Sequence, residues 1–188
     1  MKRLSLLAVL AVLAVPAFAA PVTYTIDSGH TYPAFTYTHL GFSKQTQRFN
    51  ATSGKVVLDA AAHTASVDVS IDINSIDSAS AKLAEHLKSA DFFNTAKFPT
   101  ATFKSTKVNF DGDKPATVEG DFTFMGVTKP VTLKITHFQA MPHPMMKKDA
   151  IGANATVTVK RSDFGLTMYV PYVSDEVTID ISLEAQAL

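Results

Sequence analysis

The chain contains 188 residues, and its 17 basic residues balance its 17 acidic residues, so its formal net charge at neutral pH is zero. No excess of positive charge points to nucleic acid or to an anionic membrane surface as a partner. The absence of cysteine excludes disulfides, thiolate metal sites and cysteine catalysis. Thirteen phenylalanines and no tryptophan indicate a dry aromatic interior, whether packed solid or hollow.

The N-terminal segment has the three parts of a secretory signal peptide. Lys2 and Arg3 are basic, residues 4–15 are apolar but too few to span a bilayer, and an Ala-Phe-Ala cleavage site follows. We therefore expect residues 1–19 to be removed as a signal peptide. Residues 20–188 would then form one domain, released as a soluble protein into the periplasm. The alternative is an uncleaved amphipathic anchor.

Apolar and polar residues alternate with period 2 along most of the remaining chain, which is typical of β-strands with one dry and one wet face. We expect strands over residues 22–27, 53–58 and 65–73. Residues 30–40 are rich in Thr, Tyr and Phe and are also expected to be extended. Residues 41–50 are polar, and we expect them to be irregular.

One segment breaks the alternation, at about residues 79–95. Ser80 is a candidate N-cap for a short helix that runs to about Lys88, with Leu83 and Leu87 on one face. A cluster of phenylalanines follows, and it is apolar enough to act as a plug or a lid. Its members are Phe92, Phe93 and Phe98.

The clearest β-hairpin has alternating strands over residues 117–124 and 131–136 around a turn at 125–129, with Pro130 at the start of the second strand. Further strands are expected over residues 100–110, 152–160 and 177–187, with a loop over 139–150. About eight or nine strands result. Because nearly all of them alternate, a curved antiparallel sheet that closes into a barrel gives their apolar faces one interior.

With about eight strands, the interior of a barrel is either just filled or holds one small ligand. Ala155 is a small inward residue, at which a larger side chain would fill a hollow interior. The other side chains that the alternation assigns to the interior are Val67, Val69, Ile71, Phe103, Phe122, Phe124, Val131, Leu133, Val157, Ile179, Ile181 and Leu183.

Over residues 22–187 the chain contains, in order, the motifs YTIDSGHT, THLGFSKQTQRF, HLKSADFFNTAKFPTATFKS, GDFTFMGVTKPVTL, KRSDFG and VTIDISLEA. With these motifs in this order, it resembles the YceI-like family of exported, polyisoprenoid-binding, lipocalin-like proteins. The resemblance implies an all-β fold, an extended antiparallel lipocalin-like β-barrel. In some relatives a cysteine pair brackets the loop before KRSDFG. The comparable positions here are Ala140 and Ile151, so this loop is not stapled.

The resemblance also implies an apolar tunnel for a long isoprenoid, such as a quinone tail or a prenyl lipid, without another cofactor. Transient membrane contact and a homodimer are further implications. Combined with the alternation, it predicts ligand-binding residues along the tunnel and its lid. They are Phe35, His39, Val69, Ile71, Phe92, Phe93, Phe98, Phe103, Phe122, Phe124, Leu133, Phe164, Ile181 and Leu183.

A search for catalytic motifs gives little support for an enzymatic function. The six histidines show neither HExxH nor H-x-H spacing, and the sequence has no G-x-S-x-G elbow. Asp27 and His30 are close in sequence and could form either a hydrogen bond at a strand end or a catalytic pair. His39 could bond a ligand head group or a buried carbonyl. Arg161 and Asp163 could form a pair that ties a strand end, with Gly165 in the turn that follows.

One loop carries residue types that suit copper, because thioether and imidazole groups are its soft and intermediate ligands. The residues are Met141, His143, Met145 and Met146. The simpler interpretation is a Met-rich loop that packs over the barrel, since Met fills irregular gaps. We therefore predict a binding protein for a polyisoprenoid, with a copper-binding protein as the alternative. A hydrolase or isomerase that acts on a lipid in the barrel is a third hypothesis.

Overall fold

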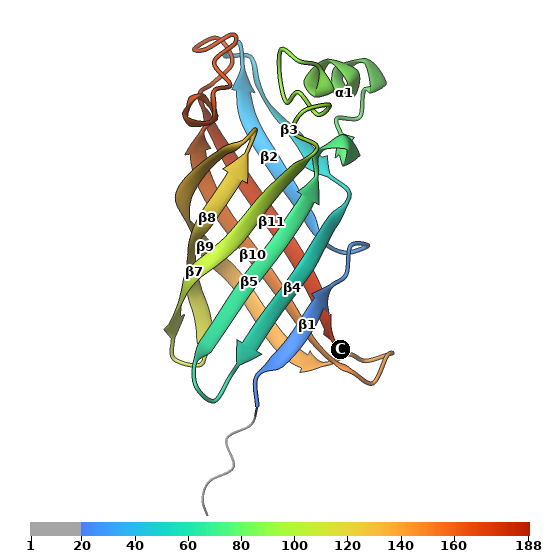
Figure 1. The fold of residues 1–188 in the computed structure, drawn as a ribbon, viewed down its shortest axis with the longest axis vertical. Coiled ribbons are helices and arrows are strands. Elements are labelled where there is room, and N and C mark those ends of the chain that lie inside the picture. Colours follow the sequence, from blue (N-terminus) through green and yellow to red (C-terminus); the bar gives the residue numbers. More distant parts are fainter. Residues whose placement is uncertain (1–19) are drawn as a thin grey trace, which may run out of the picture.

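A computed structural model describes residues 20–188, and the predicted signal peptide lies outside the described residues. The described chain forms an antiparallel sheet that closes into an eight-stranded barrel, with one helix at one end (Figure 1). The strands are β1 (Val22–Ile26), β2 (Tyr32–His39), β3 (Ser43–Phe49), β4 (Thr52–Asp59), β5 (Thr64–Asp72), β6 (Ile76–Asp77), β7 (Thr100–Asp111), β8 (Lys114–Phe124), β9 (Val127–Pro142), β10 (Asp149–Lys160) and β11 (Glu176–Ala187). The predicted fold class is confirmed.

Two pairs of short strands, β1 with β2 and β4 with β3, each take the place of one long, bent strand in the barrel wall. Strands β1 and β2 pair with successive halves of β11, and β4 and β3 pair with β1 and β2 in turn. The other strands follow in the order β4-β5-β7-β8-β9-β10-β11, and the pairing of β1 with β11 closes the ring. Closure removes the exposed sheet edges.

The expectation that residues 41–50 are irregular is wrong, because residues 43–49 form β3. This strand alternates only weakly in hydrophobicity, since it buries Gln47 and Phe49 but exposes the residues beside them. Its hydrogen-bonded neighbours are β2 and the two-residue strand β6, so it stands at the margin of the sheet. Polar residues on an exposed marginal strand cost little, which explains a strand without an apolar pattern.

The central hairpin is tighter and longer than expected. Met125 and Gly126 have φ angles of 50° and 77°, which is the left-handed pair that a two-residue hairpin turn requires. Strand β9 therefore begins at Val127, and Pro130 lies inside it rather than at its start. Half of the loop expected over 139–150 is strand, because β9 and β10 pair until Asp149 faces Pro142, and the loop itself spans residues 143–148.

Two apolar clusters occupy the two ends of the barrel. We call the end that carries helix α1 (Ala81–Lys88) the open end, and the end that carries the chain terminus Leu188 the closed end (Figure 1). The closed-end cluster is formed by Tyr24, Ile26, Val56, Leu58, Ile151 and Ala185. The open-end cluster is formed by Phe49, Ile73, Ile76, Leu87, Phe92, Phe93, Ala101 and Leu166.

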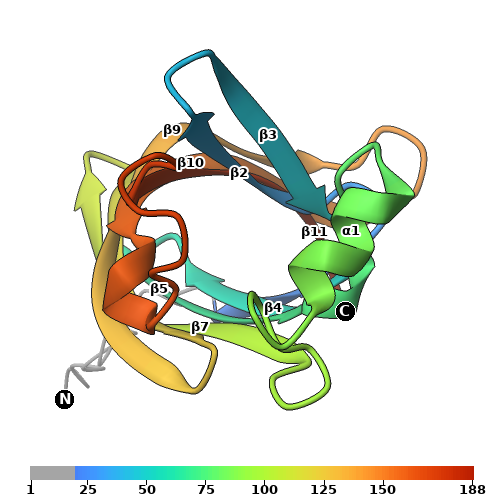
Figure 2. The ribbon, with the colours of Figure 1, turned by 90° about the horizontal axis from the view of Figure 1, so that it is seen from above.

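The open end arises because the sheet splits there. Strand β4 pairs with β5 as far as Thr52 and Ile71, and beyond this point β3 diverges toward β6. The segment between β5 and β7 fills the resulting gap with a 3-10 turn (Ile73–Ser75), β6 and α1. Seen from above, α1 and the segment after β10 lie on opposite sides of the rim (Figure 2). Within residues 20–188, no helix has the length and apolar character to cross a bilayer.

Candidate functional site

The interior of the barrel contains a cavity of about 300 Å³. Such a volume is at the lower limit of small-molecule sites, which are roughly 300–1,000 Å³. Every side chain that the alternation assigned to the interior, Ala155 excepted, lines this cavity. Ala155 is buried but is not part of the lining, whereas Val157, two residues further along the same strand, is. The wall is therefore almost entirely aliphatic and aromatic.

The cavity ends on the closed-end cluster and opens at the other end. Val67 and Leu183 line the cavity and also pack against the closed-end cluster, so they form its floor. The lining also includes His39, His86 and Tyr169, which are exposed. All three belong to segments at the open end, so the mouth of the cavity lies between α1, the end of β2 and the loop that contains Tyr169.

Helix α1 is held in place by a cap and an apolar face. Ser80 accepts a hydrogen bond from the backbone N–H of Leu83 at 3.3 Å, as an N-cap serine does. Leu83 and Leu87 both line the cavity, so the helix covers the interior with its apolar face. The predicted helix and its cap are thus confirmed.

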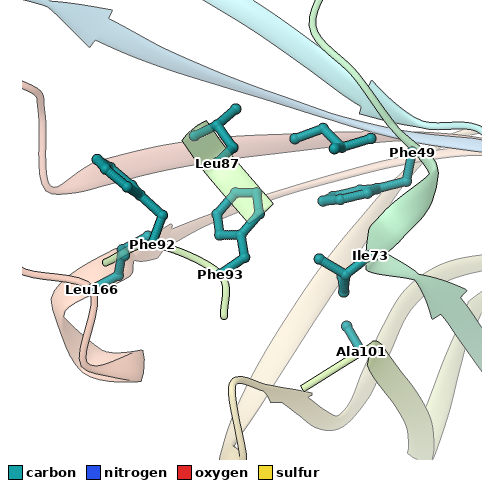
Figure 3. Packing of buried hydrophobic residues seen from close by; sticks show 8 residues of the cluster. Phe49, Ile73, Leu87, Phe92, Phe93, Ala101 and Leu166 are labelled. Carbon is teal, nitrogen blue, oxygen red and sulfur yellow. The ribbon is translucent and has the colours of Figure 1, made fainter. Parts of the chain in front are cut away.

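Aromatic rings form the rest of the lid. The Phe93 ring lies 6.0 Å from Phe35 and 5.4 Å from Phe124, edge-on in both cases. Figure 3 shows Phe92 and Phe93 between Leu166 on one side and Phe49 on the other. Phe92 also lies 6.2 Å from Tyr169, which joins the lid to the opposite rim. Such ring pairs are favourable in these geometries beyond the area that they bury.

The position of the Phe103 ring in the cavity wall depends on a glycine. A Cβ atom at Gly120 would lie 2.5 Å from the Phe103 ring and 2.6 Å from the Lys104 carbonyl oxygen. Only glycine therefore allows the Phe103 ring to lie against strand β8. The next inward residue, Phe122, stacks on Phe124 with a ring separation of 6.2 Å, and Phe164 meets both rings edge-on.

Arg161 lies at the rim and does not pair with Asp163 as predicted. Its guanidinium donates hydrogen bonds to the backbone carbonyls of the loop over residues 166–174, which we call the clamp loop. The acceptors are Leu166, Met168, Val173 and Ser174, at 2.7–3.1 Å. Asp163 is exposed. Burial lowers the pKa of the Arg161 guanidinium below its usual value, and the nearby Asp175 opposes that shift.

Tyr37 supplies a hydroxyl to the upper part of the cavity. Burial raises the pKa of this hydroxyl above its usual value, although the Gln47 side chain and the charge of Arg161 act in the opposite direction. The phenol therefore stays protonated at neutral pH and can donate or accept a hydrogen bond. The cavity thus has an apolar body and a few polar groups near its mouth.

All the predicted ligand-binding residues except Phe98 line the cavity. The Phe98 ring lies against Gly126 at the β8–β9 turn, outside the lining. Sequence reasoning missed lining residues in segments that do not alternate. They include Phe49, Leu166, Tyr169 and Val173. In the sequence, the sign that Phe49 faces the interior is that it is an apolar residue at the end of a short polar run. The clamp loop has no periodic pattern that could indicate its lining residues.

The Asp27–His30 pair lies on the outer wall rather than in the cavity. His30 Nδ1 is 2.9 Å from Asp27 Oδ2, and the His30 side chain is 66% exposed. This hydrogen bond lowers the pKa of Asp27 and raises that of His30. Glu184 brings a third ligand atom within 4.8 Å of the other two. The position at the junction of β1 and β2 agrees with a hydrogen bond at a strand end.

The Met/His loop lies at the closed end, in the hairpin between β9 and β10. Its methionines do not pack over the barrel as predicted, because Met141, Met145 and Met146 are between 49% and 82% exposed. His143 Nδ1 accepts hydrogen bonds from the backbone N–H groups of Met145 and Met146. Nδ1 is therefore occupied by the loop backbone, which leaves Nε2 as the ring atom that a metal could reach.

Comparison with known proteins gives a consistent family. The model of the YceI-like domain matches residues 24–185. A UPF0312 protein of Pseudomonas aeruginosa (strain LESB58) is 38% identical over 186 residues, which cover 97% of this chain and 96% of the relative. A second UPF0312 protein, from Shewanella sp. (strain W3-18-1), is 37% identical over 188 residues and covers 98% of both chains.

Solved structures share the fold. The Campylobacter jejuni YCEI protein is 28% identical, with a TM-score of 0.66 over 79% of this chain and 88% of the other. Burkholderia cenocepacia BcnA gives a TM-score of 0.71 at 22% identity, over 85% of this chain and 99% of BcnA. A polyisoprenoid binding domain from Saccharophagus degradans gives 0.68 at 17% identity, over 89% and 99%. The last two show likeness of fold alone.

Proposed function

Since the chain belongs to the YceI-like family, we propose that its barrel binds one long polyisoprenoid chain and sequesters or carries it. The observation that carries the proposal is the cavity, which is lined by Val, Ile, Leu and Phe and is open at one end. The similarity in fold to a polyisoprenoid binding domain supports the same ligand class. An isoprenoid quinone or a prenyl lipid has the required shape and apolar surface.

The hydrophobic effect supplies enough driving force for such a ligand. Each methylene that leaves water contributes about 0.8 kcal/mol. A chain of several isoprene units therefore binds even after the loss of its conformational entropy. In a cell the alternative environment is a bilayer, which is equally apolar, so the transfer from membrane to protein is close to balanced. A small free-energy difference allows the protein to take up the lipid and release it again, as a carrier must. An enzyme would instead have to hold its substrate until the reaction occurs.

The arrangement of the polar groups around the cavity also supports binding rather than catalysis. The guanidinium N–H groups of Arg161 donate hydrogen bonds to the clamp loop. The imidazoles of His39 and His86 lie at the exposed rim. The wall below them carries aliphatic and aromatic side chains. A reacting group deep in the cavity would therefore meet a mostly apolar surface, in which few groups can move protons or stabilise charge.

Native mass spectrometry of the purified protein tests the proposal. We expect a co-purified lipid whose mass corresponds to a prenyl chain and which leaves on extraction with organic solvent. Reloading the extracted protein with farnesol or a longer prenyl alcohol should restore a 1:1 complex. A protein that never retains or takes up a prenyl lipid would refute the proposal, and a bound copper ion instead would restore the copper alternative.

We place the protein in the periplasm on the strength of its N-terminal sequence. The basic residues, the short apolar stretch and the cleavage site of residues 1–19 support export, and the cysteine-free barrel needs no oxidation to fold. Cell fractionation followed by N-terminal sequencing should find a mature form that begins at Ala20. A full-length cytoplasmic protein would contradict this placement.

A further inference from the structure

Two neighbouring loops at the open end expose large apolar side chains. One is the tip of the β2–β3 hairpin, where Leu40 is 49% and Phe42 is 88% exposed. The other is the clamp loop, where Met168, Tyr169 and Tyr172 are 37%, 56% and 72% exposed. Side chains of this size are seldom so exposed in a group on a soluble protein, and a group of this kind marks an interaction site.

The two loops form one rigid surface. Leu40 donates its backbone N–H to the Tyr172 carbonyl at 2.7 Å, and Ser174 donates to the Thr38 carbonyl at 2.9 Å. His39 and Val173 complete the link as an isolated antiparallel bridge. Arg161 fixes the carbonyls of the clamp loop, so that Met168 and Tyr172 stay at the surface while Leu166 and Val173 line the cavity. The apolar side chains are therefore held in place and do not fold back onto the barrel.

This surface adjoins the mouth of the cavity. Tyr169 lines the cavity and is exposed at the same time, and His39 does the same from the end of β2. Figures 1 and 2 show the tip of the β2–β3 hairpin on the side of the clamp loop, while β3 runs back toward α1. A ligand that leaves the cavity between these segments emerges directly onto the exposed apolar surface.

The surface carries no carboxylate, ammonium or guanidinium group, and its one basic side chain is the imidazole of His39. The sequence of the hairpin tip is HLGFS, and that of the clamp loop is LTMYVPYVS, so both lack Asp, Glu, Lys and Arg. A charged group is costly to bring into the interfacial region of a bilayer, whereas Tyr and Phe are favoured there. The neutral surface suits the uncharged interior of a membrane rather than an anionic lipid head group.

We propose that the hairpin tip and the clamp loop form a membrane-docking surface, which inserts Phe42 and Tyr172 into a lipid bilayer and brings the cavity mouth against it. This inference rests on the proposed binding of a prenyl lipid, because such a ligand is stored in bilayers and must pass between two apolar phases. Docking at the mouth allows this passage without exposing the chain to water.

Flotation with vesicles of phosphatidylcholine tests docking directly. We expect the protein to float with these vesicles, to bind equally well when phosphatidylglycerol is added, and to be insensitive to salt. Phe42→Ser should weaken the association about tenfold, and Phe42→Ser with Tyr172→Ser should abolish it. Met145→Ser is the matched control, because Met145 is 82% exposed at the closed end, and it should leave flotation unchanged.

A transfer assay separates docking from ligand binding. The rate at which a fluorescent prenyl lipid moves from vesicles to the protein should fall about tenfold in Phe42→Ser, while its affinity in detergent micelles stays the same. Unchanged transfer and flotation in this variant would overturn the docking surface but leave the proposed function intact. A dimer in light scattering that Phe42→Ser dissociates, without vesicle binding, would assign the surface to a second copy. Vesicle binding without prenyl binding would refute the proposed function alone.

Discussion

The two ends of the barrel consist of the same kind of alternating strand, yet one is filled and the other is hollow. At the closed end β1, β4, β10 and β11 remain paired, and their inward side chains meet in a compact cluster. At the open end β3 leaves the ladder, so the inward side chains of the facing strands lose their partners. A helix and aromatic rings cover this space without filling it. Continuous strand pairing thus produces a filled core at the closed end, and the interruption of this pairing at the open end produces the cavity of the candidate site.

The same substitution at both ends should give the largest and most direct contrast. Leu58 at the closed end and Leu87 at the open end are each 7% exposed. Leu58→Ala should cost about 3 kcal/mol of unfolding free energy, because it leaves a new void in a filled core. Leu87→Ala should cost about half as much, since Leu87 already borders empty space on one side.

Chemical denaturation measures the two costs, and prenyl-lipid titration measures their effect on function. Leu58→Ala should leave the affinity for the lipid unchanged, whereas Leu87→Ala should alter it because Leu87 lines the cavity. Equal costs in both variants would mean that the two ends are packed alike. The proposed hollow site would then be in doubt.

Filling the cavity should reduce ligand binding without reducing stability. Val157→Phe places a ring where a prenyl chain would lie and displaces about four methylenes, which corresponds to about 3 kcal/mol or roughly a 100-fold loss of affinity. The melting temperature of the lipid-free protein should stay within a few degrees of the wild type. A large loss of stability would instead indicate overpacking of a solid core.

A matched control for this substitution is Val57→Phe. Val57 lies on β4 between the buried residues Val56 and Leu58, so it points to the outer wall. The added ring should change neither affinity nor the melting temperature appreciably. A loss of affinity in both variants would show that bulk anywhere on the barrel disturbs the site.

The helix that covers the open end should be sensitive to its cap. Ser80→Ala removes the hydrogen bond to the Leu83 N–H and should cost about 1 kcal/mol of local stability. Because only the lid loosens, the release of a bound prenyl lipid should be faster in a stopped-flow experiment, while global unfolding shifts little. Ser53→Ala on the exposed face of β4 serves as the control and should not alter release.

Alternation predicted the parts of the site that are regular. Side chains such as Val69, Phe122 and Ile181 were placed in the interior from their period alone, because a closed sheet allows only an inside and an outside. The limits of strand pairing are harder to predict, since β9 beyond residue 136 is mostly exposed and loses its alternation, although it still pairs with β10. The ladder also places Ala140 directly opposite Ile151, so backbone pairing holds this hairpin without a disulfide.

The irregular segments could not be predicted because their contacts are distant in sequence. Arg161 binds the carbonyls of a loop that begins five residues later, and nothing in the run LTMYVPYVS indicates that its carbonyls converge on one side chain. The same holds for Tyr169, which reaches the lid through Phe92. Local patterns specify strands, whereas the rim depends on tertiary contacts.

The smallest expected effect is a pH dependence at the junction between β1 and β2. Hydrogen bonding with His30 lowers the pKa of Asp27 below 3.8, and hydrogen bonding with Asp27 raises the pKa of His30 above 6.5. The lowered pKa adds stability that is lost as the pH falls through the folded value of Asp27. The raised pKa adds stability that is lost as the pH rises through the folded value of His30. The pair therefore stabilises the fold most between about pH 4 and 6.5.

Asp27→Asn tests this window, because the amide oxygen can still accept the hydrogen bond that Gly29 donates to Asp27 but carries no charge for His30. The melting temperature of the variant should fall below that of the wild type near pH 5.5, and the difference should shrink toward pH 3 and toward pH 8.5. The charge of Glu184 also acts on His30, and that of His143 acts on Asp27, so His143→Gln is the control that separates the pair from its neighbour. A difference in melting temperature that does not vary with pH would show that Asp27 acts only through its turn. Because His30 is mostly exposed, solvent screens the pair, and the shift should be smaller than any change expected from the lid, the cavity or the two cores.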